Sequence, residues 1–151
     1  MSMDAEMRKK EREFLNFFEN IDQIMSDITI RNKDELIEML KAQLYSGERS
    51  DGSMIVPKYA SNTIRQKKKL GHPTDRVTLL WKGDFYDSIT ATQNGSVITF
   101  DATDEKKSML LSKYQRGDAK ILDLNQDWLI TFINEVVNPE LIIIGKRIIE
   151  N

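Results

Sequence analysis

The hydrophobic residues of the first part of the chain recur with the spacing of a helix. They fall at intervals of three, four and seven, which places on one helix face Phe14, Phe17, Phe18, Ile21, Ile24, Met25 and Ile28. Charged residues occupy the other positions between Arg8 and Asp27. The pattern predicts an amphipathic helix over residues 1–30, which either packs on the core or projects to dock on a partner.

A second helix is predicted directly after the first. Asn32 and Glu35 have the spacing of a capping pair, so this helix begins near Lys33, and Gly47 ends it. The polar stretch 46–53, with the sequence SGERSDGS, has no periodicity. It predicts an exposed loop.

A third, basic helix is predicted over residues 60–70, with Gly71 as its C-terminal stop. Its run of lysines leaves only Ile64 and Leu70 as apolar anchors, so we expect this helix to lie on the surface. The apolar segment from Arg76 to Trp81 then predicts a short strand.

A hairpin is predicted over residues 88–101, because Asn94-Gly95 is the preferred pair for a two-residue type I′ turn. Pairing outward from this turn places two apolar pairs on one sheet face: Ala91 opposite Ile98, and Ile89 opposite Phe100. The other face then carries Thr90, Thr92, Thr99 and Val97.

The last third of the chain is mainly helical in pattern. A short helix is predicted over residues 105–114, and residues 119–124 predict either a strand or an extended arm. The helical region 125–151 begins near Asp127, and we expect a break or kink at Pro139 because proline disrupts a helix interior. The chain thus reads as a single α+β domain, with helices at both ends around a small antiparallel sheet.

Beyond Pro139 the chain is apolar nearly all round. Such a segment needs cover on more than one side, either from its own core or from another subunit. The second alternative predicts a subunit contact through Ile142, Ile143, Ile148 and Ile149.

Composition limits the chemistry that the chain can perform. It has no cysteine and one histidine, which excludes disulfides, thiolate metal sites and mechanisms that need two histidines. No phosphate-binding glycine loop and no G-x-S-x-G motif occur, and His72 is read as an exposed turn residue. The carboxylates Asp84/Asp87 and Asp101/Asp104/Glu105 have the chemistry of a hard-cation site, but turn and cap roles explain them more simply. We therefore predict no enzyme, no cofactor and no metal site.

No membrane association is predicted either. The longest aliphatic run, Leu141–Ile144, is far shorter than the ~20 residues of a membrane-spanning helix. The charged N-terminus lacks the apolar core of a signal peptide.

Positive charge is concentrated in the middle of the chain. The whole sequence has a formal net charge of −2, whereas residues 51–82 hold seven basic and two acidic residues, a local excess of five positive charges. This contrast predicts an interaction surface for protein or for the nucleic-acid backbone. Its candidate residues are Arg65, Lys67, Lys68, Lys69 and Arg76.

The same segment carries an ordered set of short motifs: Thr63, Lys67 and Lys69, Gly71, Val77-Thr78-Leu79, Gly83-Asp84-Phe85 and Ser88-Ile89, followed by the hairpin. This order resembles tail-completion and Mu-like virion morphogenesis proteins of tailed bacteriophages. In those families a Thr…Lys…Gly stretch leads to a Leu-x-x-Thr-Gly-x-Leu…Ser-Ile-like element and then strands. The preceding stretch 43–60 is similar to segments of such proteins from phages and prophages of Bacteroidetes-type hosts.

The resemblance covers residues 36–124 and includes two departures. Lys82 stands where those families have Thr or Ser before the glycine, and residues 113–117 replace a later His-Gln-Phe-Gly-like element. The resemblance implies a structural virion protein, either a head–tail connector (neck) or a tail-completion subunit.

Several expectations follow from this resemblance. The subunit would assemble in the host cytoplasm into a homo-oligomeric ring of the virion. Its partners would be the portal or connector ring and tail-tube proteins, and its basic surface would face such a partner or packaged DNA. The alternative is a small nucleic-acid-binding accessory protein that uses the basic helix 58–76.

Overall fold

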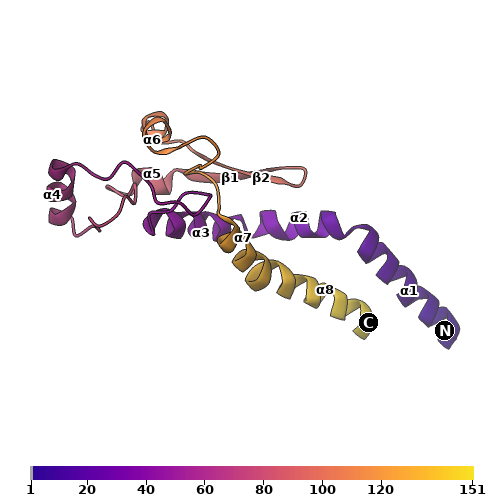
Figure 1. Ribbon diagram of the computed structural model, residues 1–151. Helices are drawn as coiled ribbons and strands as arrows, with labels where there is room; N and C mark the ends of the chain where they lie inside the picture. Colours follow the sequence, from indigo (N-terminus) through magenta and orange to yellow (C-terminus); the bar gives the residue numbers. More distant parts are fainter. Residues whose placement is uncertain (1) are drawn as a thin grey trace.

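The computed structural model describes residues 2–151 and has helices at both ends of the chain around a two-stranded antiparallel sheet (Figure 1). This architecture confirms the predicted α+β class. The elements in chain order are α1 (Met3–Glu19), α2 (Ile21–Arg31), α3 (Lys33–Tyr45), α4 (Ser61–Lys69), α5 (Asp84–Asp87), β1 (Ile89–Asn94), β2 (Val97–Ala102), α6 (Lys107–Tyr114), α7 (Gln126–Phe132), the π-helical turn η1 (Ile133–Val137) and α8 (Asn138–Glu150).

The predicted N-terminal helix is interrupted at Asn20. Its backbone leaves helical geometry, with φ −108° and ψ 14°, and its side-chain Nδ2 donates to the carbonyl oxygen of Asn16 at 2.8 Å. Asparagine competes for backbone hydrogen bonds in this way, which is why it is poor in helix interiors. The chain changes direction there, and α1 extends beyond the core (Figure 1).

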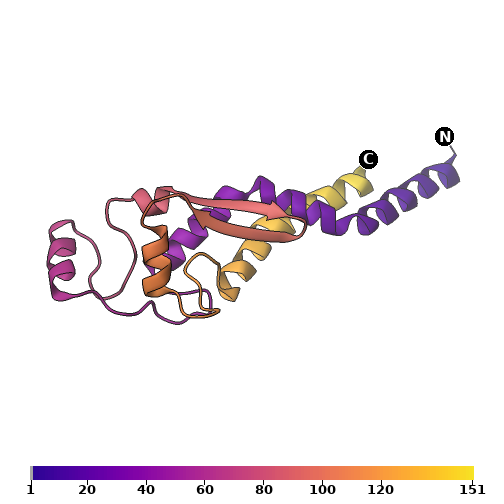
Figure 2. The same ribbon diagram turned by 90° about the horizontal axis from the view of Figure 1, so that it is seen from above.

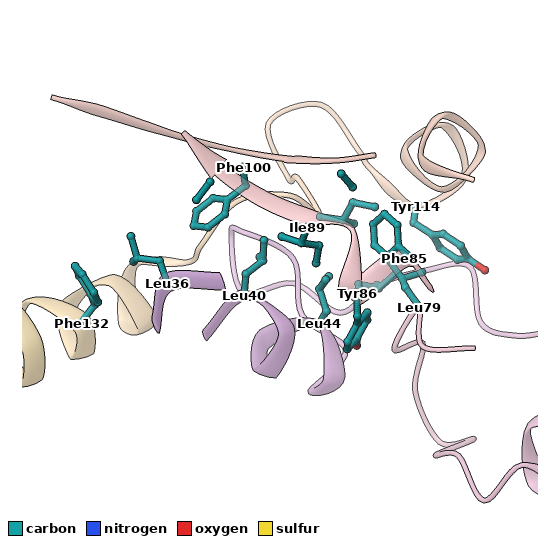
Figure 3. Close-up of a cluster of buried hydrophobic side chains, with 14 of the residues drawn as sticks. Leu36, Leu40, Leu44, Leu79, Phe85, Tyr86, Ile89, Phe100, Tyr114 and Phe132 are labelled. Carbon is teal, nitrogen blue, oxygen red and sulfur yellow. The ribbon is translucent and has the colours of Figure 1, made fainter. Parts of the chain in front are cut away.

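Helix α3 is the centre of the core. Its buried leucines Leu36, Leu40 and Leu44 recur every four residues and therefore form one face. That face packs below the hairpin, toward Ile89 and Phe100 (Figure 3). Burying each such leucine contributes about 1.5–3 kcal/mol to folding.

The ends of α3 agree with the sequence prediction in position. The helix begins at Lys33, and Gly47 follows it with the positive φ of 79° that glycine adopts readily. The predicted cap at Asn32 is wrong, because its side chain makes no cap hydrogen bond. Its Nδ2 donates instead to the Ile28 carbonyl at 2.8 Å and to Glu140 at 3.1 Å.

The segment 46–53 is less exposed than predicted, because Arg49 lies inside it. This side chain is buried and donates to the carbonyl oxygens of Tyr114, Met54 and Val56, at 2.8, 3.0 and 2.9 Å. One guanidinium thus satisfies carbonyl groups from two distant parts of the chain. Within this segment the exposed residues are Ser46 at its start and Asp51-Gly52 at its tip.

The hairpin has the predicted faces but a different register. Ala91 lies opposite Phe100 and Gln93 lies opposite Ile98, so the pairing is shifted by two residues from the prediction. The loop is Gly95-Ser96, with Gly95 at φ 61°, where a type II′ turn places its glycine. A shift of two keeps every side chain on its face, so the apolar face still covers the core.

No strand forms over residues 76–81, in contrast to the prediction. The backbone N–H groups of Thr78 and Leu79 donate to the Tyr59 hydroxyl at 3.1 and 3.0 Å, and Tyr86 donates its hydroxyl to the Thr78 carbonyl at 2.5 Å. Side chains therefore provide the hydrogen-bond partners for the backbone groups of this buried segment, a role that a neighbouring strand plays in a sheet. Residues 119–124 likewise form no strand: Ala119 makes an isolated bridge with Arg116, and the chain bends at 121–123.

The C-terminal region is one continuous helical rod, and the predicted break at Pro139 is absent. Proline lacks the N–H that a helix needs and crowds the preceding turn. The π-helical turn η1 precedes it, and there the Asn138 N–H donates to the Ile133 carbonyl, five residues back. This wider turn accommodates the proline without ending the helix.

Candidate assembly surfaces

The basic helix α4 lies at the end of the molecule opposite to the two termini (Figures 1 and 2). The prediction that α4 lies on the surface is correct for most of its length, since Arg65, Lys68 and Lys69 are exposed. No acidic residue occurs within the helix. Leu70, predicted as an apolar anchor, is half exposed at 50%.

Lys67 is the residue that anchors α4, which corrects its place in the predicted surface patch. Its side chain is only 2% exposed, and its Nζ donates to the Leu80 carbonyl. The ammonium also lies over two aromatic rings, 4.6 Å from the centre of Tyr59 and 5.6 Å from that of Trp81. These contacts give the cation a protein environment in place of water, so Lys67 does not present its charge to a partner.

Arg76 is also committed to contacts within the chain. Its Nε donates to the Tyr45 carbonyl at 2.7 Å, its guanidinium pairs with Asp75 at 2.8 Å, and it stacks over the Tyr45 ring. The exposed basic group that remains on α4 is therefore Arg65, Lys68 and Lys69.

A small cavity of about 160 Å³ lies beside Lys67. Aromatic residues form much of its wall, including Tyr59, Trp81 and Phe85. His72 closes the neighbouring turn, with its Nε2 at 2.7 Å from the Trp81 carbonyl oxygen. His72 is therefore half-buried and serves to hold this turn, which corrects its prediction as an exposed residue.

Lysines lie beside three of the five carboxylates considered as a cation site, Asp84, Asp101 and Asp104. Asp101 accepts a hydrogen bond from Lys107 at 2.8 Å, which lowers the pKa of that carboxyl. Lys106 lies 4.0 Å from Asp84 and 3.9 Å from Asp104. Among residues 2–151, no group of three or more histidines and carboxylates is placed to hold a metal ion.

The second candidate surface is the arm formed by α1 and α8, which are packed against each other and extend beyond the core (Figure 2). Lys10 Nζ donates to the Ile149 carbonyl at 2.9 Å near the tip. Neither helix contains a fully buried residue. The arm is therefore held together by partial contacts and leaves much apolar surface in water.

The predicted contact residues lie on this arm. Ile142, Ile143 and Ile149 are 57%, 49% and 57% exposed, and Ile148 is partly buried. Helix α1 adds further large exposed side chains. Phe18 belongs to the predicted apolar stripe, whereas Met3, Met7 and Leu15 were not assigned to a contact. Met3 and Met7 lie one helical turn apart, a spacing that would have revealed them had the apolar stripe been followed to the N-terminus.

The base of the arm is fixed by an ion pair between α2 and α8. Glu140 accepts a hydrogen bond from Arg31 at 2.5 Å and one from Asn32 at 3.1 Å. These two bonds, led by the one from Arg31, lower the pKa of the Glu140 carboxyl. The orientation of α8 is thus set where it leaves the core.

The rod Gln126–Glu150 has 25 residues and contains an 18-residue stretch apolar enough to cross a membrane, by length and composition alone. Only 11% of its most apolar stretch is buried. Glu135 and Glu140 lie in the middle of this rod, and a charged side chain at the bilayer centre is costly.

Comparison of the chain with protein-family models, with curated proteins and with solved structures finds no match. Function is therefore argued from the surfaces themselves. They are the basic end on α4 and the apolar α1–α8 arm at the opposite end of the molecule.

Proposed function

We propose that this chain is a structural virion subunit of a tailed phage, a head–tail connector (neck) or tail-completion protein that acts by assembling into a ring. The observation that carries the proposal is the exposed apolar surface of the α1–α8 arm. Large apolar side chains gathered on one exposed element mark an interaction site. The resemblance of residues 36–124 to virion morphogenesis proteins supports a phage particle as the assembly to which this surface belongs.

The energetic argument for contact through the arm is direct. Ile142, Ile149 and Phe18 are each more than half exposed. Covering the exposed part of each contributes roughly 1 kcal/mol, about half the value of a fully buried side chain. A ring repeats this gain at every interface, so modest contacts per subunit suffice for a closed assembly.

The two ends of the molecule then have separate roles. The arm binds a neighbouring subunit, and the basic end of α4 faces a portal or connector ring, a tail-tube protein or packaged DNA. No catalytic residue, cofactor or metal is needed for this work, which takes place in the virion after assembly in the host cytoplasm.

A membrane role for the rod 126–150 is less favourable. A span centred on this rod would place Glu135 and Glu140 near the bilayer midplane, where a charged residue costs roughly 2.5–3.5 kcal/mol. Glu140 is instead paired with Arg31 of the same chain. Protein contact fits the rod better.

The test is to induce particle formation in the producing cell and to fractionate the lysate on a density gradient, with the untagged chain detected by mass spectrometry. We expect the chain to migrate with DNA-filled particles. The double variant I142S/I149S should fold and remain in the soluble fractions, whereas M109S, a change at a 53% exposed side chain outside both the arm and α4, should enter particles normally. Wild-type chain found only in soluble or membrane fractions refutes the proposal.

One observation favours the alternative, a nucleic-acid-binding accessory protein: Arg65, Lys68 and Lys69 are exposed together on a helix without acids. Three phosphate contacts predict a slope of about −2.7 for the logarithm of the duplex-DNA binding constant against the logarithm of salt concentration. The triple variant R65E/K68E/K69E should abolish binding. Binding that is absent at low salt removes this alternative.

A further inference from the structure

In the described part of the chain, residues 2–151, no strand lies beside the outer edge of β2. Thr103 N–H donates to the Ser88 carbonyl at 3.2 Å, which fixes the alternation of the antiparallel ladder. Going from that pair toward the turn, every second pair is joined by backbone hydrogen bonds. These hydrogen-bonded pairs are Thr90 with Asp101, Thr92 with Thr99, and Asn94 with Val97. The backbone groups of Ile98 and Phe100 therefore point outward from β2, and those of Ala91 and Gln93 point outward from β1.

These outward groups on β2 are open. Within residues 2–151, neither Ile98 nor Phe100 has a backbone partner outside the hairpin, whereas the N–H of Ala102 is met by Asp101 at 2.8 Å. A groove of about 380 Å³ runs along this edge and is lined by each residue from Val97 to Asp101. Its other side is formed by residues of α6 and of the loop 120–123, among them Leu111 and Leu122.

The hairpin lacks the features that keep edge strands from pairing. Natural proteins protect such edges with lysine, proline or bulges, and neither β1 nor β2 contains a lysine, an arginine or a proline. The register runs without a bulge from one end to the other. The one charged residue, Asp101, is already paired with Lys107. Two six-residue edges without protection favour pairing with another strand.

We propose that the edge of β2 pairs with the β1 edge of a second copy of this chain, so that the sheet continues from subunit to subunit. This inference rests on the proposed ring. In a ring every hairpin keeps the same direction along the axis, so the neighbour's β1 runs antiparallel to β2. The two edges are different surfaces, and such a head-to-tail contact is the kind that closes into a ring. β1 carries no charge, so it meets no like charge at Asp101.

The test is backbone hydrogen exchange at single-residue resolution on the purified full-length protein, at dilute and at high concentration. We expect association at high concentration, with at least tenfold slower exchange of the amides of Ile98 and Phe100 on β2 and of Ala91 and Gln93 on β1. The Thr99 amide is the internal control, because it is bonded within the hairpin in either state. A chain that stays monomeric, or an oligomer in which the Ile98 and Phe100 amides are unchanged, overturns the proposal.

A matched pair of variants separates the backbone from the side chain. Ile98→Pro removes the outward N–H, and proline is tolerated at such edge positions. Ile98→Ala removes a comparable amount of side chain and keeps the N–H. We expect Ile98→Ala to associate like wild type and Ile98→Pro to stay monomeric, with hairpin amide exchange showing that both are folded. Equal association of the two folded variants overturns the proposal, and the wild-type exchange data decide if Ile98→Pro does not fold.

The outcomes also separate this inference from the proposed function. Oligomers protected on the α1–α8 arm but not at Ile98 and Phe100 would refute the shared sheet and leave the ring intact. A protected edge in a protein that never enters particles would support self-association and refute the virion role.

Discussion

Lys67 provides the sharpest test of how the basic segment works. The sequence presents it as one of three equivalent lysines, whereas the structure buries it against Tyr59, Trp81 and the Leu80 carbonyl. In Lys67→Glu, a carboxylate would face a carbonyl oxygen and the negative faces of two rings. The variant loses a charged hydrogen bond worth about 1.5–3 kcal/mol and a desolvated cation–π contact worth about 2 kcal/mol.

Together these losses amount to about 4 kcal/mol before the cost of the buried carboxylate is added. For a chain of this size, 1 kcal/mol corresponds to roughly 2–4 °C in Tm, so Lys67→Glu should lower Tm by at least about 8 °C. The control is the double variant K68E/K69E, which reverses two exposed charges and should shift the unfolding free energy by less than about 1 kcal/mol. Thermal unfolding followed by circular dichroism measures both.

The reasoning is refuted if Lys67→Glu and K68E/K69E melt alike. It is supported if Lys67→Glu alone is destabilised, and in that case a loss of particle assembly caused by reversing all three lysines would report on folding. The role of the exposed basic surface of α4 is tested only by changing its exposed residues, Lys68 and Lys69 together with Arg65.

Three further outcomes are expected from the core and the base of the arm. Leu40→Ala should lower the unfolding free energy by about 2–5 kcal/mol in urea titration, because Leu40 is fully buried; a loss below 1 kcal/mol would contradict its central place. Arg49→Ala should lower it by about 3 kcal/mol, since three carbonyl groups lose their donor, and proteolysis should become faster at 46–56; unchanged cleavage would contradict this role. Glu140 has a pKa below its usual 4.5, so its contribution to stability is present above that pH and is lost as pH falls toward the lower folded value. Glu140→Gln should therefore flatten the pH dependence of Tm below about pH 5, and an unaltered profile would show that its pairing with Arg31 is not stabilising.

Local pattern was enough to find the longer helical segments and the two faces of the hairpin, but it missed the break at Asn20 and the short helix α5. The apolar spacing of α3 is regular. In β1 and β2 the alternation of apolar and polar residues fixes which side chains face the core, whichever residues form the turn. The register could not be found in the same way, since Asn94-Gly95 and Gly95-Ser96 are both good turns. Only contacts with α3 decide between two registers that preserve the same faces.

The candidate surface was predicted in part, for a physical reason. Charge counting treats Lys67 like Lys68 and Lys69, because burial of a lysine depends on aromatic partners that are distant in sequence. Its spacing of three from Ile64 was the one local sign that it shares the inward face of α4. The exposure of the C-terminal isoleucines, in contrast, could be predicted. Their helix is apolar on several sides, and a domain this short has too little surface to cover all of them.

The two termini lie at the same end of the arm, because α1 runs toward the core and α8 runs away from it (Figure 1). A mechanical load applied between the ends would therefore peel the two helices apart, one turn after another. The ion pair of Arg31 and Glu140 stands where that separation would reach the core. The leucine face of α3 and the hairpin would carry no load until the two helices had separated. The arm would therefore unfold before the core does.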